Sequence, residues 1–223
     1  MTPRAIVARA REEGLALIAV CDHNSAENAA AVAAAGQREG LAVIPGIEIT
    51  TREEVHILGL FDGVSDLQAV QNRVYACLDG RNEPEVFGRQ FVVSEDGAIV
   101  GENERLLIGA CDLALEEVAE LIHSHSGCVI ASHIDREGFG LIGHLGFVPD
   151  VALDGLEVSP RMTVAEARAR FALGKEYPMI RSSDAHRLDE IASVASVLEM
   201  AAPTVEEIRW ALRGERGRSA VAE

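Results

Sequence analysis

Short apolar runs alternate along this chain with segments of helical period, in which apolar residues recur every three or four positions. The apolar runs predict strands over 15–21, 41–49, 54–61, 128–132, 153–158, 179–182 and 193–200. The periodic segments predict helices over 2–14, 25–39, 115–125, 164–173 and 204–214. Strand and helix therefore follow one another through most of the chain, which is typical of an α/β fold built from parallel βαβ units.

Residues 62–112 interrupt this alternation. Their pattern predicts a helix over 67–78 and then a β-hairpin, whose strands at 90–93 and 98–100 are joined by a turn containing Asp96-Gly97. This segment, called the excursion below, is too short to build a core of its own. We therefore expect a single domain over residues 1–223 with the excursion at 62–112 attached to it.

Composition narrows the function classes. The chain has 223 residues and a formal net charge of −16, which argues against an extended nucleic-acid groove because phosphates would be repelled. Its four cysteines are far apart and form no Cys-x-x-Cys pair, which favours reduced thiols and a cytoplasmic location. No apolar stretch is long enough to span a membrane.

Polar side chains stand where the expected strands end. They are Asp22, His23, Glu48, His133, Asp184 and His186, with His56 close by. In a parallel barrel the carboxyl ends of the strands converge on one face. Neutral imidazoles and carboxylates are ligands that Zn, Mn and Fe(II) accept. One such histidine alone would be read as a structural residue, but the whole set at equivalent positions predicts a metal cluster.

These residues resemble the PHP superfamily, which is named for polymerase and histidinol phosphatase. The matching motifs are Asp22-His23, Gly46-Ile47-Glu48, Val55-His56-Ile57-Leu58-Gly59, Ala131-Ser132-His133 and Ser183-Asp184-Ala185-His186. The resemblance implies a distorted (β/α)7 barrel that binds up to three divalent metal ions, as Zn, Mn or Fe. It implies one ion on His23 and His186, a second on Glu48, His56 and His133, and a third on Glu48 and Asp184. Asp22 is expected to serve catalysis by orienting a ligand.

The chain departs from the family at its start. The family opens with a His-x-His motif on the first strand, and nothing before Thr2 supplies it. We therefore expect the first strand to be missing or truncated and fewer metal ions to bind, with the Glu48, His56 and His133 ion best preserved. The internal His123-Ser124-His125 is expected at the opposite face of the barrel, where the C-terminal end of a helix accounts for its imidazoles.

The resemblance implies a metal-dependent phosphoesterase, a phosphoric ester hydrolase that acts through a metal-activated hydroxide. A small phosphorylated metabolite or nucleotide is the expected substrate, and a nucleic-acid polymer is not. Arg136 and Arg161 follow strand ends on the expected face and are candidates to bind phosphate, although solvated surface arginines would look the same. The missing His-x-His favours an alternative, a non-catalytic or regulatory module with a degenerate site. A hydrolase of C–N bonds is disfavoured because no lysine stands at a strand end.

Overall fold

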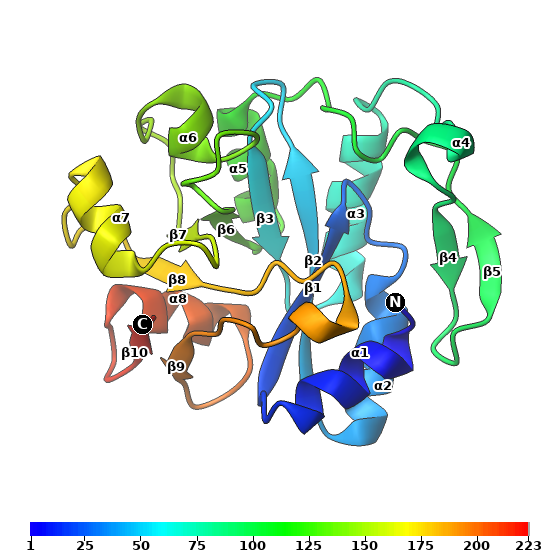
Figure 1. Cartoon of the computed structure of the whole chain (residues 1–223), viewed down its shortest axis with the longest axis horizontal. Helices are drawn as coiled ribbons and strands as arrows, with labels where there is room; N and C mark the ends of the chain where they lie inside the picture. Colours follow the sequence, from blue (N-terminus) through cyan, green and yellow to red (C-terminus); the bar gives the residue numbers. More distant parts are fainter. Residues whose placement is uncertain (223) are drawn as a thin grey trace.

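A curled sheet of six strands forms the centre of the fold (Figure 1). The structure, a computed structural model, describes residues 1–222. In spatial order the strands are β1 (Leu17–His23), β2 (Ala42–Thr50), β3 (His56–Leu60), β6 (Cys128–Ala131), β7 (Gly155–Val158) and β8 (Met179–Arg181). The expected α/β class is confirmed, and the sheet is an open half-barrel.

The sheet is parallel except at β3. Strand β1 pairs in parallel with β2, β6 with β7, and β7 with β8, but β3 runs antiparallel to both of its neighbours. The connection between β2 and β3 spans only residues 51–55, and a parallel crossover needs about a dozen residues. His56, the first residue of β3, therefore lies at the end of the sheet where β2 finishes, which is the end that carries Glu48.

Helices cover both faces of the sheet and one of its edges. The longer ones are α1 (Pro3–Glu12), α2 (Ala29–Glu39), α3 (Val64–Tyr75), α5 (Leu115–Ser124), α7 (Val164–Phe171) and α8 (Val205–Arg213). Alternate strand residues face opposite sides: Ile47 and Ile57 pack in the cluster with α3 and α5, whereas Ile130 packs in the cluster with α8. Helices α1 and α2 pack together and enclose a third cluster beside β1.

The part of the excursion that follows α3 lies beside α1 and α2, at the edge of the molecule away from β8 (Figure 1). It comprises α3, the short helix α4 (Pro84–Phe87) and the antiparallel pair β4 (Phe91–Val93) and β5 (Ile99–Glu102). The turn between those strands has Gly97 at φ 82°, a conformation that glycine adopts without strain. The remaining short elements are α6 (Leu141–Leu145), a 3₁₀ turn (Leu188–Glu190) and the antiparallel pair β9 (Val197–Glu199) and β10 (Ser219–Val221).

The half-barrel leaves a seam, which we define as the gap between its edge strands β1 and β8. A cavity of about 360 Å³ opens there. Apolar side chains of both edges line it, together with Leu58, Leu60 and Ile130 from the middle of the sheet. Glu48 and Asp184 reach the same cavity, so the seam leads to the predicted site. No helix in residues 1–222 combines the length and apolar character that crossing a membrane requires.

A buried carboxylate, Asp154, ties α8 to the bottom of the sheet. Its oxygens accept hydrogen bonds from the Val129 amide and the His123 ring, each at 3.0 Å, and from Arg213 at 2.8 Å. Burial alone would raise the pKa of Asp154, but these donors and the Arg209 guanidinium hold it well below its usual range. His123 is thus engaged in a structural cluster.

Replacing this carboxylate is expected to destabilise the fold. Asp154→Asn should lower the free energy of unfolding by about 1–3 kcal/mol, because the buried carboxylate would no longer accept the charge-assisted hydrogen bonds of Arg209 and Arg213. Because the pKa of Asp154 is lowered on folding, the stabilisation is complete at neutral pH and is lost as the pH falls below the ordinary aspartate range. Urea unfolding at pH 7 and at acid pH measures this, with the exposed Asp189→Asn as the matched control. An equal difference at both pH values would contradict the assignment.

Candidate metal centre

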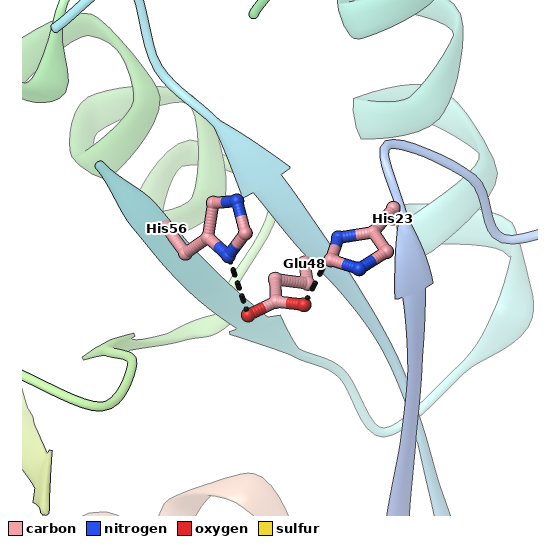
Figure 2. A group of neighbouring side chains, drawn as sticks. All are labelled: His23, Glu48 and His56. Atoms are coloured by element: carbon pink, nitrogen blue, oxygen red, sulfur yellow. Dashed lines mark ion pairs between the residues drawn. The ribbon is translucent and has the colours of Figure 1, made fainter. Parts of the chain in front are cut away.

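Three side chains converge at the carboxyl end of β1 and β2 (Figure 2). The parallel register places His23 directly opposite Glu48, and the antiparallel register brings His56 to the neighbouring strand position. His23 Nδ1 lies 3.2 Å from Glu48 Oε2, and His56 Nδ1 lies 3.1 Å from Glu48 Oε1. One ligand atom from each residue falls within 4.8 Å of the other two. We call these three residues the ligand group.

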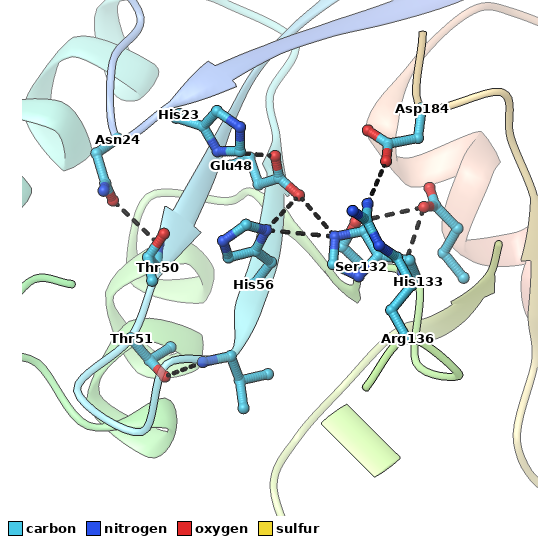
Figure 3. A network of polar contacts seen from close by, with 12 residues as sticks. His23, Asn24, Glu48, Thr50, Thr51, His56, Ser132, His133, Arg136 and Asp184 are labelled. Atoms are coloured by element: carbon cyan, nitrogen blue, oxygen red, sulfur yellow. Dashed lines mark hydrogen bonds and ion pairs between the residues drawn. The ribbon is translucent and has the colours of Figure 1, made fainter. Parts of the chain in front are cut away.

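His133 adds a fourth donor from the next strand (Figure 3). It follows β6, and its Nε2 lies 3.4 Å from Glu48 Oε1 and 3.3 Å from His56 Nδ1. Its backbone has φ 29°, a conformation that residues other than glycine rarely adopt. Such strain is characteristic of functional positions, where the surrounding structure imposes it. The backbone at this strand end therefore turns the ring toward Glu48.

The ligand group fits a divalent cation. Burial tends to raise the pKa of Glu48, but the close imidazoles of His133 and His56 outweigh it and hold the pKa below its usual range. Burial lowers the pKa of His23, so its ring is neutral. Carboxylate and neutral imidazole are the metal-binding forms. His23 Nδ1 and Glu48 Oε1 are buried and make no hydrogen bond of ordinary geometry, which leaves their lone pairs available to a cation.

Asp184 and His186 lie at the margin of this centre. Asp184 follows β8 with φ 45°, and its Oδ2 accepts a hydrogen bond of 2.8 Å from Arg136 Nη1. His186 is 62% exposed, and its Nδ1 donates to the Asp184 carbonyl at 2.8 Å. Its ring centre is 6.1 Å from that of His23. The structure thus groups His23 with Glu48 and His56, and holds Asp184 against the predicted phosphate-binding arginine.

The two other predicted residues stand further out. Asp22 is half-buried and accepts a hydrogen bond from Asn28 at 3.1 Å. Burial raises the pKa of Asp22. Arg161 is exposed in the loop after β7, and no contact within residues 1–222 joins its side chain to the group. Asp22 and Arg161 remain predictions as site residues.

The buried carboxylate of Glu157, which belongs to none of the family motifs, holds the strand ends beside the centre together. Glu157 in β7 accepts hydrogen bonds from the His133 amide and the Ser132 hydroxyl at 3.3 Å each, and from the Ser182 hydroxyl at 2.6 Å. It therefore connects the ends of β6 and β8 that carry His133 and Asp184. In the sequence, Glu157 stands out only as an isolated acid at the end of an apolar strand.

Asn24 connects the strand ends that carry His23 and Glu48. Its amide nitrogen donates to the carbonyls of Leu107 and Gly109 at 2.8 and 2.7 Å, and its oxygen accepts from the Thr50 amide at 3.0 Å. Its backbone has φ 48° directly after His23. Asn24 thereby joins the end of β1 to the end of β2 and to the excursion. In the sequence, the only indication of this role for Asn24 is its position next to His23.

The glycine-rich loop after His133 folds over the ligand group. Phe139 stacks on the His56 ring at 4.6 Å between centres, and its carbonyl accepts from the His56 amide at 2.9 Å. Gly143 packs so closely against the Arg136 carbonyl that a Cβ atom would overlap it. The loop can adopt this conformation only with glycine at position 143, because any side chain there would collide with the Arg136 carbonyl.

Gly143→Ala is therefore expected to displace the loop that carries His133 and Arg136. We expect metal affinity to fall roughly 10- to 100-fold, as it does when groups that orient metal ligands are lost. Calorimetric titration with Zn²⁺ or Mn²⁺ measures the change. Gly138→Ala is the matched control, because an added Cβ there meets open space. Unchanged affinity in Gly143→Ala would show that the loop does not position the ligands.

Known proteins resemble this chain in part of its sequence and in its fold. Residues 166–216, which include β8 and α8, match the family model described as PHP-associated. The lesion-specific endonuclease PfuEndoQ from Pyrococcus furiosus has 20% sequence identity and a TM-score of 0.71 over 99% of this chain and 53% of its own. A Bifidobacterium adolescentis protein described as a metal-dependent phosphoesterase has 21% identity and a TM-score of 0.57 over 83% of this chain and 82% of its own. No curated protein matches the chain in sequence.

The resemblance to the PHP superfamily is confirmed. Identities near 20% show a shared fold, and the half-barrel is a distorted PHP-type barrel. The chain spans about half the length of PfuEndoQ, since it covers 53% of that protein. The PHP-type fold accounts for ligands on neighbouring strand ends, and Glu48 with the three imidazoles around it fits divalent-metal use.

One sequence-based expectation is wrong. We expected a small phosphorylated partner and excluded a nucleic-acid polymer, but Endonuclease Q was solved with a 27-mer duplex whose abasic lesion lies at the active site. That structure has a TM-score of 0.66 and 19% identity, over 98% of this chain and 53% of its own. The error lies in using the net charge of −16, which sums the whole surface. Binding of a phosphate depends on charge near the site, where the Arg136 guanidinium lies beside Asp184.

Proposed function

We propose that this protein is a metal-dependent phosphoric ester hydrolase that cleaves a phosphodiester of DNA. The observation that carries the proposal is the convergence of His23, Glu48 and His56, with His133 beside them, at one end of a PHP-type sheet. PfuEndoQ and the Endonuclease Q complex, which share this fold across nearly the whole chain, support DNA as the substrate. The four free cysteines favour a cytoplasmic location.

The proposed ligands are His23, Glu48 and His56, with His133 completing the set. A divalent cation there would supply Lewis-acid polarisation of a phosphoryl oxygen and a lowered pKa for water. Glu48 offers both carboxylate oxygens to the nitrogens on either side, so its position lets it serve two ions. Among Zn, Mn and Fe, histidine-rich sites accept each, so availability decides the occupant.

The remaining residues position the substrate and the ligands. The Arg136 guanidinium, 43% exposed, lies where a phosphate at the centre would meet it, and it can exchange Asp184 for a phosphate oxygen. Glu157 and Asn24 hold the strand ends in register, which keeps the donors in place without a rearrangement. Phe139 covers His56 and reduces the access of bulk water to that ring.

The proposal is tested on a duplex that carries one stable abasic analogue. The purified chain is incubated with this duplex and Mn²⁺, and strand scission is followed on a denaturing gel. We expect scission that EDTA abolishes and that added Mn²⁺ or Zn²⁺ restores. Intact metal binding without scission of this duplex would refute the hydrolase proposal and favour the regulatory module.

A further inference from the structure

A second cavity, of about 290 Å³, opens beside the metal centre. It lies between the end of β1 and the excursion, and His23 lines it. Its outer walls are apolar, formed by Phe87 at the end of α4, Phe91 in β4 and Ile108. Phe87 is 51% exposed and Ile108 is 49% exposed, so this wall offers apolar surface to a ligand. We call this space the excursion pocket.

The excursion pocket is built rigidly. The Asn28 amide donates to Asp22 Oδ2 at 3.1 Å and to the Phe91 carbonyl at 3.3 Å, and its oxygen accepts from the Val93 amide at 3.0 Å. Buried Asn103 donates to Glu27 and to the Tyr75 hydroxyl, each at 2.7 Å. These bonds fix the excursion against α2 and β1, so a ligand would meet a preformed wall.

The chemistry of the walls selects the ligand class. Asp22 and Glu27 both line the pocket, and carboxylates there disfavour an anionic phosphate but accept N–H donors. The Arg89 guanidinium covers the Phe91 ring at 4.7 Å from its centre, whereas Phe87 remains half exposed. A neutral, flat ligand with N–H groups at its edge satisfies these features. A heterocyclic base has that shape and that edge.

We propose that the excursion pocket takes an unstacked nucleobase, with Phe87 as its stacking partner. The inference rests on the proposed function, because His23 belongs to both the ligand group and the pocket wall. A phosphodiester at the centre places a flanking nucleotide next to this wall. Removing a base from the duplex stack is the general route by which enzymes reach groups inside DNA. The excursion then contributes to recognition of the base beside the cleaved bond.

The test compares two duplexes in EDTA, so that no hydrolysis occurs. Both contain a stable abasic analogue as the target, and they differ at the flanking position, which holds 2-aminopurine in one and a second abasic analogue in the other. Phe87→Ala should weaken binding of the 2-aminopurine duplex roughly tenfold and leave the other unchanged. The wild-type protein should also change 2-aminopurine fluorescence, and the variant should not. Phe147→Ala, at an exposed phenylalanine outside the pocket, is the matched control.

Three results would overturn the inference: equal weakening of both duplexes by Phe87→Ala, no weakening of either, or no binding of either by the wild-type protein. Failure of the proposed function is seen separately, as a wild-type protein that binds both duplexes and cuts neither after metal is restored. The base-dependent difference in affinity does not require cleavage. The nucleobase pocket and the hydrolase activity are therefore tested by different measurements.

Discussion

Glu48→Gln is expected to lower the rate of DNA strand scission by roughly a thousandfold or more. The amide cannot accept from both sides as the carboxylate does, and it removes the only anionic member of the ligand group. Glu48 is 5% exposed and pairs with three histidines, and the ligand group contains no second carboxylate that could take its place. Single-turnover cleavage of the abasic duplex at saturating Mn²⁺ measures the rate.

Two comparisons make this result specific. Glu116→Gln changes an exposed glutamate on α5 and should retain the wild-type rate. Circular dichroism should show that Glu48→Gln is folded, since glutamine has nearly the same volume. A folded Glu48→Gln protein with wild-type turnover would place the chemistry elsewhere in the molecule. The same variant also measures any contaminating nuclease.

Removing divalent cations is expected to abolish scission and to lower the melting temperature. A cation at one hundred times its dissociation constant stabilises the folded state by about 2.7 kcal/mol, which corresponds to roughly 5–11 °C for a domain of this size. The ligand nitrogens and carboxylate come from three separate strands, so the unfolded chain binds the cation far more weakly. Thermal unfolding with EDTA and with increasing Mn²⁺ or Zn²⁺ measures the shift.

The thermal shift also assigns the ion to its residues. In His56→Ala the cation should no longer raise the melting temperature, whereas His125→Ala, in the structural His-x-His segment, should respond like the wild type. A wild-type response in His56→Ala would show that the cation binds outside the ligand group. Lost scission with an unchanged melting temperature would mean that the cation binds the DNA alone.

Most of the elements could be predicted from hydrophobic periodicity, because each one buries a single face. Thr204 caps the start of helix α8 and Gly214 caps its end, as their capping chemistry indicates. The direction of β3 could not be predicted from its own residues, since an apolar strand reads the same in both directions. It follows from the short 51–55 connection. The helix predicted from residue 25 begins only at Ala29, because Ser25 forms a β-bridge with Asp22 instead.

The sequence identified the donors of the centre but not their grouping. His23 and Glu48 follow from polar residues at predicted strand ends and His56 from its family motif, whereas their closeness depends on strand register. The pairing of Arg136 with Asp184 depends on how two loops meet, and neither loop has a periodic pattern. The DNA substrate that we propose could not be predicted from net charge, because an average over the surface hides the charge of one site.

The seam divides the metal centre between strands of unequal stability. Glu48, His56 and His133 are held by the buried middle of the sheet, but His23 ends β1 and Asp184 follows β8, the two edges beside the cavity. Edge amides open more readily, so native-state hydrogen exchange should be fastest in β8 and β1 and slowest in β3 and β6. A cation on the ligand group would join the β1 edge to the middle of the sheet through His23. Slower hydrogen exchange of the β1 amides on adding Mn²⁺, with unchanged exchange in β10, would show this connection directly.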